Sequence, residues 1–253
     1  MNEQIKNWLI NYPATAAPIK MNLICFPFAG GGTVNYGRWR AELHETIDLY
    51  AFNFPGRERF FNQHCLTDYS SLIADLSQLL RNKSDIPFVF FGHSFGGLTA
   101  YFTALELKKI NAPEPRHVFI SARVPPNTPL HKIADLNDQQ FTSALIERYQ
   151  GIPEEILKNP QLMQLFIPII QKDFKLYEQY PALFSSYADQ KISCDMTTIS
   201  YTDDSHHKEA QMHDWQNYTQ GMYQHIELPG GHFEILYQWK NIVALINQLI
   251  VTP

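Results

Sequence analysis

Two hydrophobic periods alternate along the first half of the chain. Short apolar runs, which are typical of buried strands, occupy residues 21–26, 47–54, 86–91 and 117–121. Between them, apolar residues recur at helical spacing, in a helix that we expect Thr67 to cap and in residues 96–109. Strands that alternate with helices predict an α/β fold with a mostly parallel central sheet. We expect the ligand site at the carboxyl ends of its strands.

The alternation stops after residue 123. From Val124 to about Gln190, helical spacing continues without a strand, so these helices do not connect strands of the sheet. We therefore expect residues 124–190 to be a helical lid, inserted into a single domain of residues 1–253. The simpler alternative is that these helices only pack on the sheet.

Both ends of the chain also predict regular structure. Residues 1–20 indicate a short helix, with Trp8 on its apolar side, and a proline-containing lead-in. Further strands are expected at 192–201 and 224–228. A last helix is expected from the helical spacing of Ile235 to Ile246.

The composition is that of an ordinary globular protein and narrows the function classes. Of the 253 residues, 45% are hydrophobic and 18% are charged, and the net charge of −5 gives nucleic-acid binding no electrostatic support. The three cysteines form no metal or redox pattern. The first residues lack the apolar core of a signal peptide, and no apolar run approaches the roughly 18 residues of a membrane span. We expect a cytoplasmic protein without nucleic-acid or membrane partners.

The segment Gly92-His-Ser-Phe-Gly96 contains the pattern G-x-S-x-G between a predicted strand and a predicted helix. A strand, a tight turn and a helix are the setting of a nucleophile elbow, in which the serine lies on a strained turn. The N-terminus of the helix also favours negative charge nearby. We predict that Ser94 is a catalytic nucleophile; the alternative is a chance match to a short pattern.

A serine nucleophile needs a general base, which in turn needs an orienting acid. In α/β-hydrolases these residues follow in the order serine, acid, histidine. His232 lies in a Gly-Gly-His loop after the predicted strand 224–228, and we predict it as the base rather than as a structural histidine. The fold is therefore expected to be an α/β-hydrolase fold.

The acid is expected directly after the predicted strand 192–201, where two aspartates are adjacent. We favour Asp204 over Asp203. A metal site of Asp203, Asp204, His206 and His207 is a less favoured alternative, because the spacing matches no recognised ligand pattern. No metal and no other cofactor is expected.

The oxyanion hole is expected to consist of two backbone N–H groups. One belongs to Phe95, the residue after the nucleophile. The other comes from the loop after the first strand of the apolar series, where Ala29 is preferred and Phe28 is the alternative.

Several motifs in the chain recur in the same order in one known family. They are Phe26-Pro-Phe-Ala-Gly-Gly31, Phe54-Pro-Gly-Arg57, Gly92-His-Ser-Phe-Gly-Gly97, Ser121-Ala-Arg-Val-Pro-Pro126, Tyr149-Gln-Gly-Ile-Pro153, Asp173-Phe174 and Pro229-Gly-Gly-His-Phe233. From about residue 20 to its end, the chain resembles type II thioesterases, the stand-alone editing enzymes of nonribosomal peptide and polyketide synthases.

The resemblance implies a triad of Ser94, Asp204 and His232, and a lid that forms one wall of an acyl pocket reached by phosphopantetheine. The acid motif departs from the family pattern. The family has a glycine near its start and a proline after the acid, where this chain has Ser200-Tyr201 and Ser205.

The function that we expect is hydrolysis of acyl groups from phosphopantetheine thioesters of carrier proteins, through an acyl-enzyme. The carrier binds in trans to a monomer, and acyl-CoA is a further expected substrate. An acidic carrier could contact a basic patch of Arg38, Arg40, Arg57 and Arg59. The alternatives are a carboxylester hydrolase and a non-catalytic partner-binding protein on a hydrolase scaffold.

Overall fold

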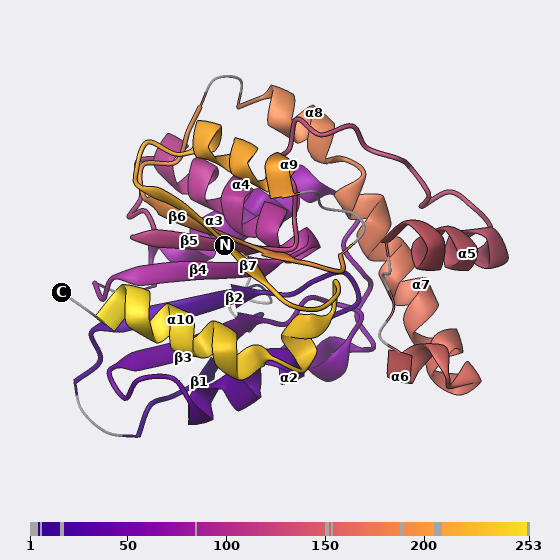
Figure 1. The fold of residues 1–253 in the computed structure, drawn as a ribbon, viewed down its shortest axis with the longest axis horizontal. Helices are drawn as coiled ribbons and strands as arrows, with labels where there is room; N and C mark the ends of the chain where they lie inside the picture. Colours follow the sequence, from indigo (N-terminus) through magenta and orange to yellow (C-terminus); the bar gives the residue numbers. More distant parts are fainter. Residues whose placement is uncertain are drawn as a thin grey trace.

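The computed structural model describes residues 5, 7–15, 18–83, 85–149, 152, 154–187, 190–204 and 209–251. Its centre is a seven-stranded sheet in the order β1-β3-β2-β4-β5-β6-β7 (Figure 1). The parallel strands are β2 (Met21–Phe26), β3 (Ile47–Phe52), β4 (Phe88–His93), β5 (His117–Ser121), β6 (Asp195–Tyr201) and β7 (Tyr223–Leu228). The predicted mostly parallel sheet is confirmed.

The edge strand β1 (Leu9–Tyr12) corrects the end of the helix that we predicted within residues 1–20, because Leu9 lies in the strand. Ile5 is helical, and residues 1–4 and 6 lie outside the described residues. The residues of β1 pair antiparallel with β3. Trp8 lies in the hydrophobic core, and its carbonyl accepts a hydrogen bond from the backbone N–H of Asn53 at 2.7 Å. Pairing with the free edge of β3 therefore determines the structure of these residues and outweighs the helical spacing of the apolar positions.

Helices cover both faces of the sheet, and each face has its own hydrophobic core. Consecutive residues of β4 belong to different cores: Phe88 and Phe90 to one, Val89 and Phe91 to the other. Burial on both faces explains why the sequence of β4 is a continuous apolar run. The first face carries α3 (Tyr69–Arg81) and α4 (Phe95–Lys109), and the second carries α2 (Val34–Gly37) and α10 (Trp239–Val251) (Figure 1).

Two helix starts differ from the prediction. Asp68, not Thr67, caps α3, because its carboxylate accepts a hydrogen bond from the backbone N–H of Ser71 at 2.6 Å. The apolar stretch from Ile235 is divided between a short 3-10 helix and α10. The short helices are η1 (Arg38–Ala41), η2 (Glu58–Phe60), α9 (Glu209–His213), η3 (Asp214–Tyr218) and η4 (Glu234–Leu236).

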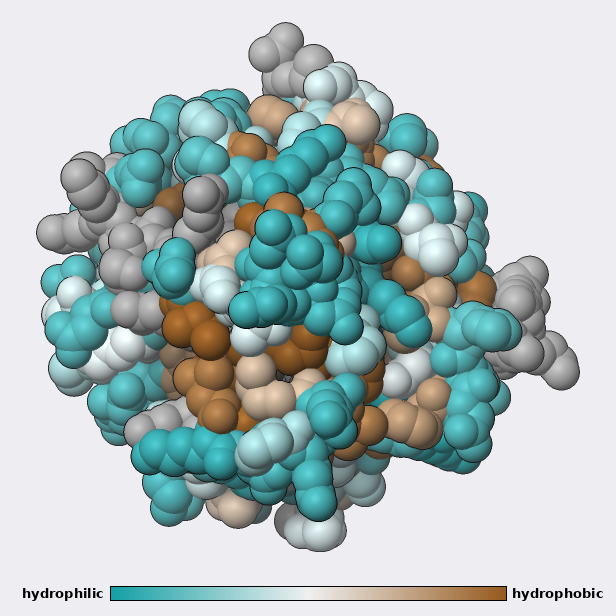
Figure 2. Space-filling view, turned by 90° about the vertical axis from the view of Figure 1, so that its right-hand side faces the viewer, coloured by the Kyte–Doolittle hydropathy of each residue, from teal (hydrophilic) through white to brown (hydrophobic). Residues whose placement is uncertain are grey.

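Between β5 and β6, the residues that the structure describes form four helices and no long strand. They are α5 (Asp138–Tyr149), α6 (Glu154–Leu157), α7 (Pro160–Tyr177) and α8 (Tyr180–Ser185), which we call the α5–α8 segment. The segment lies beside the carboxyl ends of the parallel strands, on the right in Figure 1. Figure 2 shows that side of the molecule, where apolar side chains gather around a hollow. No helix in the described ranges is long and apolar enough to cross a membrane.

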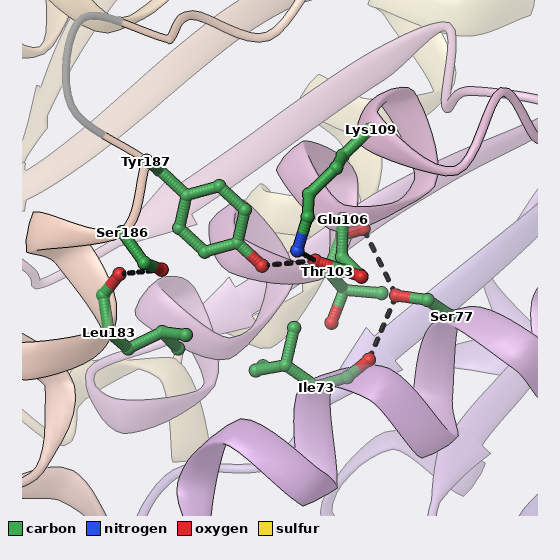
Figure 3. Close-up of polar contacts among 8 residues, drawn as sticks. All are labelled: Ile73, Ser77, Thr103, Glu106, Lys109, Leu183, Ser186 and Tyr187. Carbon is green, nitrogen blue, oxygen red and sulfur yellow. Dashed lines mark hydrogen bonds and ion pairs between the residues drawn. The ribbon is translucent and has the colours of Figure 1, made fainter.

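The end of the α5–α8 segment is attached to α4. The hydroxyl of Tyr187 donates to Glu106 of α4, which also forms an ion pair with Lys109 at 3.0 Å (Figure 3). On the other side of α4, the buried Ser77 of α3 donates to the carbonyl of Thr103 at 3.4 Å. The contact of Tyr187 thus fixes the end of the segment to the helix that begins at the predicted nucleophile, and the contact of Ser77 joins α3 to the same helix.

Candidate active site

Ser94 lies on the strained turn that the sequence predicts. It joins β4 to α4 with φ of 53° and ψ of −117°, in a region that residues with a side chain rarely adopt. A Cβ added at Gly92 would lie 2.1 Å from the carbonyl oxygen of Gly96, and one added at Gly96 would lie 2.1 Å from that of Phe26. Glycine is therefore required on both sides of the serine.

His232 and Asp204 meet although they follow different strands. Nδ1 of His232 and Oδ2 of Asp204 are 2.7 Å apart, and the two side chains are buried. The loops that carry them are joined by a backbone hydrogen bond from Asp203 to Gly230 at 2.8 Å. The side chain of Asp203 is exposed, so the geometry favours Asp204 as the partner of the histidine.

One cavity of about 660 Å³ brings the other predicted residues together. Ser94, His232, Phe95 and Ala29 all line it. The α5–α8 segment contributes a wall, with Phe174 and Tyr177 of α7 among the lining residues. The ring of Phe28, the alternative to Ala29, is instead packed against those of His93 and Phe233.

The glycine-rich loop that carries Ala29 is fastened to α7 by a buried carboxylate. Oδ2 of Asp173 accepts from the backbone N–H of Gly30 at 2.7 Å. The same carboxylate pairs with Arg57 through two hydrogen bonds of 2.7 and 2.6 Å, and Arg57 also donates to the carbonyl of Gly31 at 3.0 Å. Burial alone would lower the pKa of Arg57, but the Asp173 carboxylate outweighs it and raises that pKa.

Sequence reasoning assigned no role to this pair, although both residues stand in the recurring motifs. Arg57 and Asp173 are 116 positions apart, and no local pattern links residues at such a distance. Their place in the recurring motifs is the one sequence signal, because other charged residues stand next to both of them.

The comparisons with known proteins agree with this geometry. A family model for the thioesterase domain matches residues 21–250. The chain belongs to the thioesterase family. The human medium-chain S-acyl fatty acid synthase thioesterase (Homo sapiens) is 32% identical to this thioesterase, over 93% of this chain and 87% of the human one.

Two solved structures are similar to this thioesterase along nearly their whole length. ClbQ, from the colibactin NRPS/PKS pathway, is 27% identical with a TM-score of 0.83, over 91% of this chain and 97% of its own. BorB, a type II thioesterase from the borrelidin biosynthetic cluster, is 25% identical with a TM-score of 0.82, over 95% and 96%. The α/β-hydrolase fold and the resemblance to type II thioesterases are confirmed, and the protein is a thioester hydrolase.

A second histidine of this thioesterase lies beside His232, where the sequence pattern showed only a variable position of the elbow. His93 is fully buried, and its ring centroid is 5.1 Å from that of His232. Its Nδ1 is 3.0 Å from Oγ of Ser121, which is itself 3.2 Å from the hydroxyl of Tyr201. The buried ring of His93 thus packs against the ring of the predicted base.

The predicted basic patch is wrong for Arg57. Arg57 is only 4% exposed and is occupied by Asp173, so it offers no charge to a partner. Arg40 donates to the carbonyls of Leu43 and His44. Arg38 and Arg59 are exposed, so for these two arginines the contact with an acidic carrier stays a prediction.

The metal alternative lies partly outside the described residues, because these do not include Ser205, His206 or His207. Within the described ranges, no three His, Cys, Asp or Glu side chains gather to hold a metal ion. The expectation of a reaction without a cofactor stays a prediction.

Proposed function

We propose that the protein hydrolyses acyl groups from phosphopantetheine thioesters of carrier proteins in trans, through an acyl-enzyme on Ser94. The observation that carries the proposal is that Ser94, on its strained turn, lines the same cavity as His232, whose other side contacts Asp204. The relatives named for a fatty acid synthase and for an NRPS/PKS pathway support it.

In the first half of the reaction, Oγ of Ser94 attacks the thioester carbonyl while His232 takes its proton. Nδ1 of His232 faces Asp204, so Nε2 is the nitrogen that serves the serine. Asp204 keeps the ring in this orientation and stabilises the imidazolium ion that forms. His232 then gives the proton to the leaving thiol, and water repeats the cycle on the acyl-enzyme.

The tetrahedral intermediates carry a negative oxygen that needs donors. We assign this role to the backbone N–H groups of Phe95 and Ala29, whose residues both line the cavity. Loss of one such donor typically costs about 3–4 kcal/mol of transition-state stabilisation. Because Asp173 and Arg57 hold the neighbouring Gly30 and Gly31, they set the position of the Ala29 donor.

The α5–α8 segment acts as the lid of a single domain in this proposal. Its helix α7 supplies Phe174 and Tyr177 to the cavity wall. The apolar hollow on this side of the molecule suits an acyl chain and the pantetheine arm (Figure 2). The protein acts as a cytoplasmic monomer, and acyl-CoA is a second substrate class with the same arm.

The test is parallel hydrolysis of acetyl-carrier protein, acetyl-CoA and p-nitrophenyl acetate by the wild type and by Ser94→Ala. Ser71→Ala is the matched control, because Ser71 is exposed on α3. We expect serine-dependent cleavage that favours the carrier-bound thioester. Equal or faster cleavage of the simple ester would instead make the protein a carboxylester hydrolase, and full activity of Ser94→Ala would contradict the proposed chemistry.

A further inference from the structure

One arginine lines the cavity, and it is buried without a carboxylate partner among the described residues. Arg123 follows β5 and is 7% exposed. Its Nη1 donates to the hydroxyl of Tyr177, and the guanidinium carbon lies 4.9 and 5.2 Å from the ring centroids of Tyr177 and Tyr180. No ion pair among the described residues involves Arg123.

This arrangement leaves the charge only partly compensated. A guanidinium stays protonated in proteins, and charged side chains are rarely buried unless they are paired. Phenol hydroxyls and ring faces offset some of the cost of removing the charge from water, but they carry no negative charge. An anion at this position would complete the pairing.

The residues that line the cavity indicate that such an anion would belong to the acyl group of the substrate. Arg123 and Tyr177 line it together with Ser94 and His232, and no Asp or Glu of the described residues does. An acyl group attached to Ser94 therefore shares this cavity with a permanent positive charge and with no negative charge of the described lining residues. A carboxylate matches the fork of a guanidinium through two parallel hydrogen bonds.

We infer that Arg123, with the hydroxyl of Tyr177, forms a carboxylate-binding subsite, so that the cavity selects acyl groups with a free carboxylate, the monothioesters of dicarboxylic acids. This inference rests on the proposed function, because it concerns the acyl part of the same substrate. The subsite binds the far end of the acyl group, and the bond that is broken remains the thioester.

A phosphate is the other anion that a carrier-bound substrate brings. N-acetylcysteamine thioesters separate the two sources, because they keep the thioester and part of the pantetheine arm but have no phosphate. The malonyl and isovaleryl groups have the same branched shape, as do the succinyl and 4-methylpentanoyl groups. Within each pair, only the first member carries a negative charge.

The experiment measures kcat/KM for both pairs with the wild type, Arg123→Met, Arg123→Lys and the control Arg81→Met, which changes an exposed arginine at the end of α3. We expect the wild type to favour the charged member of at least one pair. Arg123→Met should lower the charged-to-neutral ratio by about tenfold or more, and Arg123→Lys by less, because lysine keeps the charge but not the fork. Arg81→Met should leave the ratio unchanged.

The outcomes separate the inference from the proposed function. A wild type that cleaves the neutral member faster in both pairs overturns the subsite, whatever the variants do, and so does an unchanged ratio in folded Arg123→Met. If Arg123→Met fails to fold, Arg123→Lys and the wild-type ratio still decide. Absence of serine-dependent cleavage of any thioester would overturn the proposed function as well.

Discussion

Two buried arginines contact the same helix, α7, and their surroundings differ in one respect. Arg57 has a carboxylate partner, Asp173, whereas Arg123 has Tyr177. Asp173 and Tyr177 are four positions apart on α7, so one face of this helix contacts both arginines. Nε is buried without a hydrogen bond in both arginines, so the difference between them lies in the carboxylate.

Because of this difference, the charge of Arg57 has a structural role, whereas the charge of Arg123 is available to a ligand. The Arg57 pair holds the backbone of Gly30 and Gly31 and thereby fixes the loop that carries Ala29. Arg123 holds no loop through its guanidinium; the link from its backbone to Trp215 uses the carbonyl group. One helix would thus position the oxyanion donor and also present the acyl-binding charge.

The largest effect is expected from Arg57→Met. It leaves the Asp173 carboxylate buried without its cation, which costs about 3–5 kcal/mol of unfolding free energy. Denaturant unfolding measures this loss, and kcat/KM should fall with it because the glycine-rich loop is released. The double variant Arg57→Met/Asp173→Leu should regain most of the stability but not the activity, since the N–H of Gly30 then has no acceptor. Unchanged stability of the single variant would show that the pair does not hold the loop.

Removal of an exposed carboxylate, that of Asp68, should lower the unfolding free energy by an intermediate amount. Asp68 caps α3, and Asp68→Ala should cost about 1 kcal/mol. The hydrogen bond from Ser71 lowers the pKa of Asp68, so its contribution is present above the pKa of the unfolded chain and is lost as the pH falls through the folded value. Unfolding curves of the wild type and Asp68→Ala should therefore converge in acid. A constant difference at every pH would contradict the assignment of Asp68 as the cap.

The smallest effect on stability is expected from Arg123→Met, the same substitution as at Arg57. Replacing a buried charge that lacks a counter-ion removes a desolvation cost and also removes the contacts with two tyrosine rings. These opposing contributions should leave the unfolding free energy within about 1 kcal/mol of the wild type. A loss as large as that of Arg57→Met would mean that Arg123 is as structural as Arg57, and the comparison would fail.

The sequence predicted what depends on local pattern. The parallel strands, the elbow at Ser94 and the order of serine, acid and histidine follow from short apolar runs, glycine positions and spacing. Leu9 was mispredicted as helical because the structure of residues 9–12 depends on pairing with the edge of β3. The sequence favoured Asp204 over the adjacent Asp203, and the contact of Asp204 with His232 supports that choice.

The residues that the sequence did not explain act across long separations. Asp173 meets Arg57 over 116 positions, and Tyr177 meets Arg123 over 54. Neither pairing leaves a periodic signal in the chain, because each depends on how α7 packs against loops of the sheet. The burial of Arg57, which removes it from the predicted basic patch, has the same origin.

The central claim is that Ser94 carries the acyl group between the two halves of the reaction. The most direct measurement mixes the wild type and Ser94→Ala with acetyl-carrier protein, stops the reaction in acid within milliseconds and maps the acetyl group by peptide mass spectrometry. We predict one acetyl group on the wild-type peptide that contains Ser94 and none on the variant, with hydrolysis by the variant slower by about 10³-fold or more. Acetyl on another residue, or hydrolysis by Ser94→Ala at the wild-type rate, would contradict the claim.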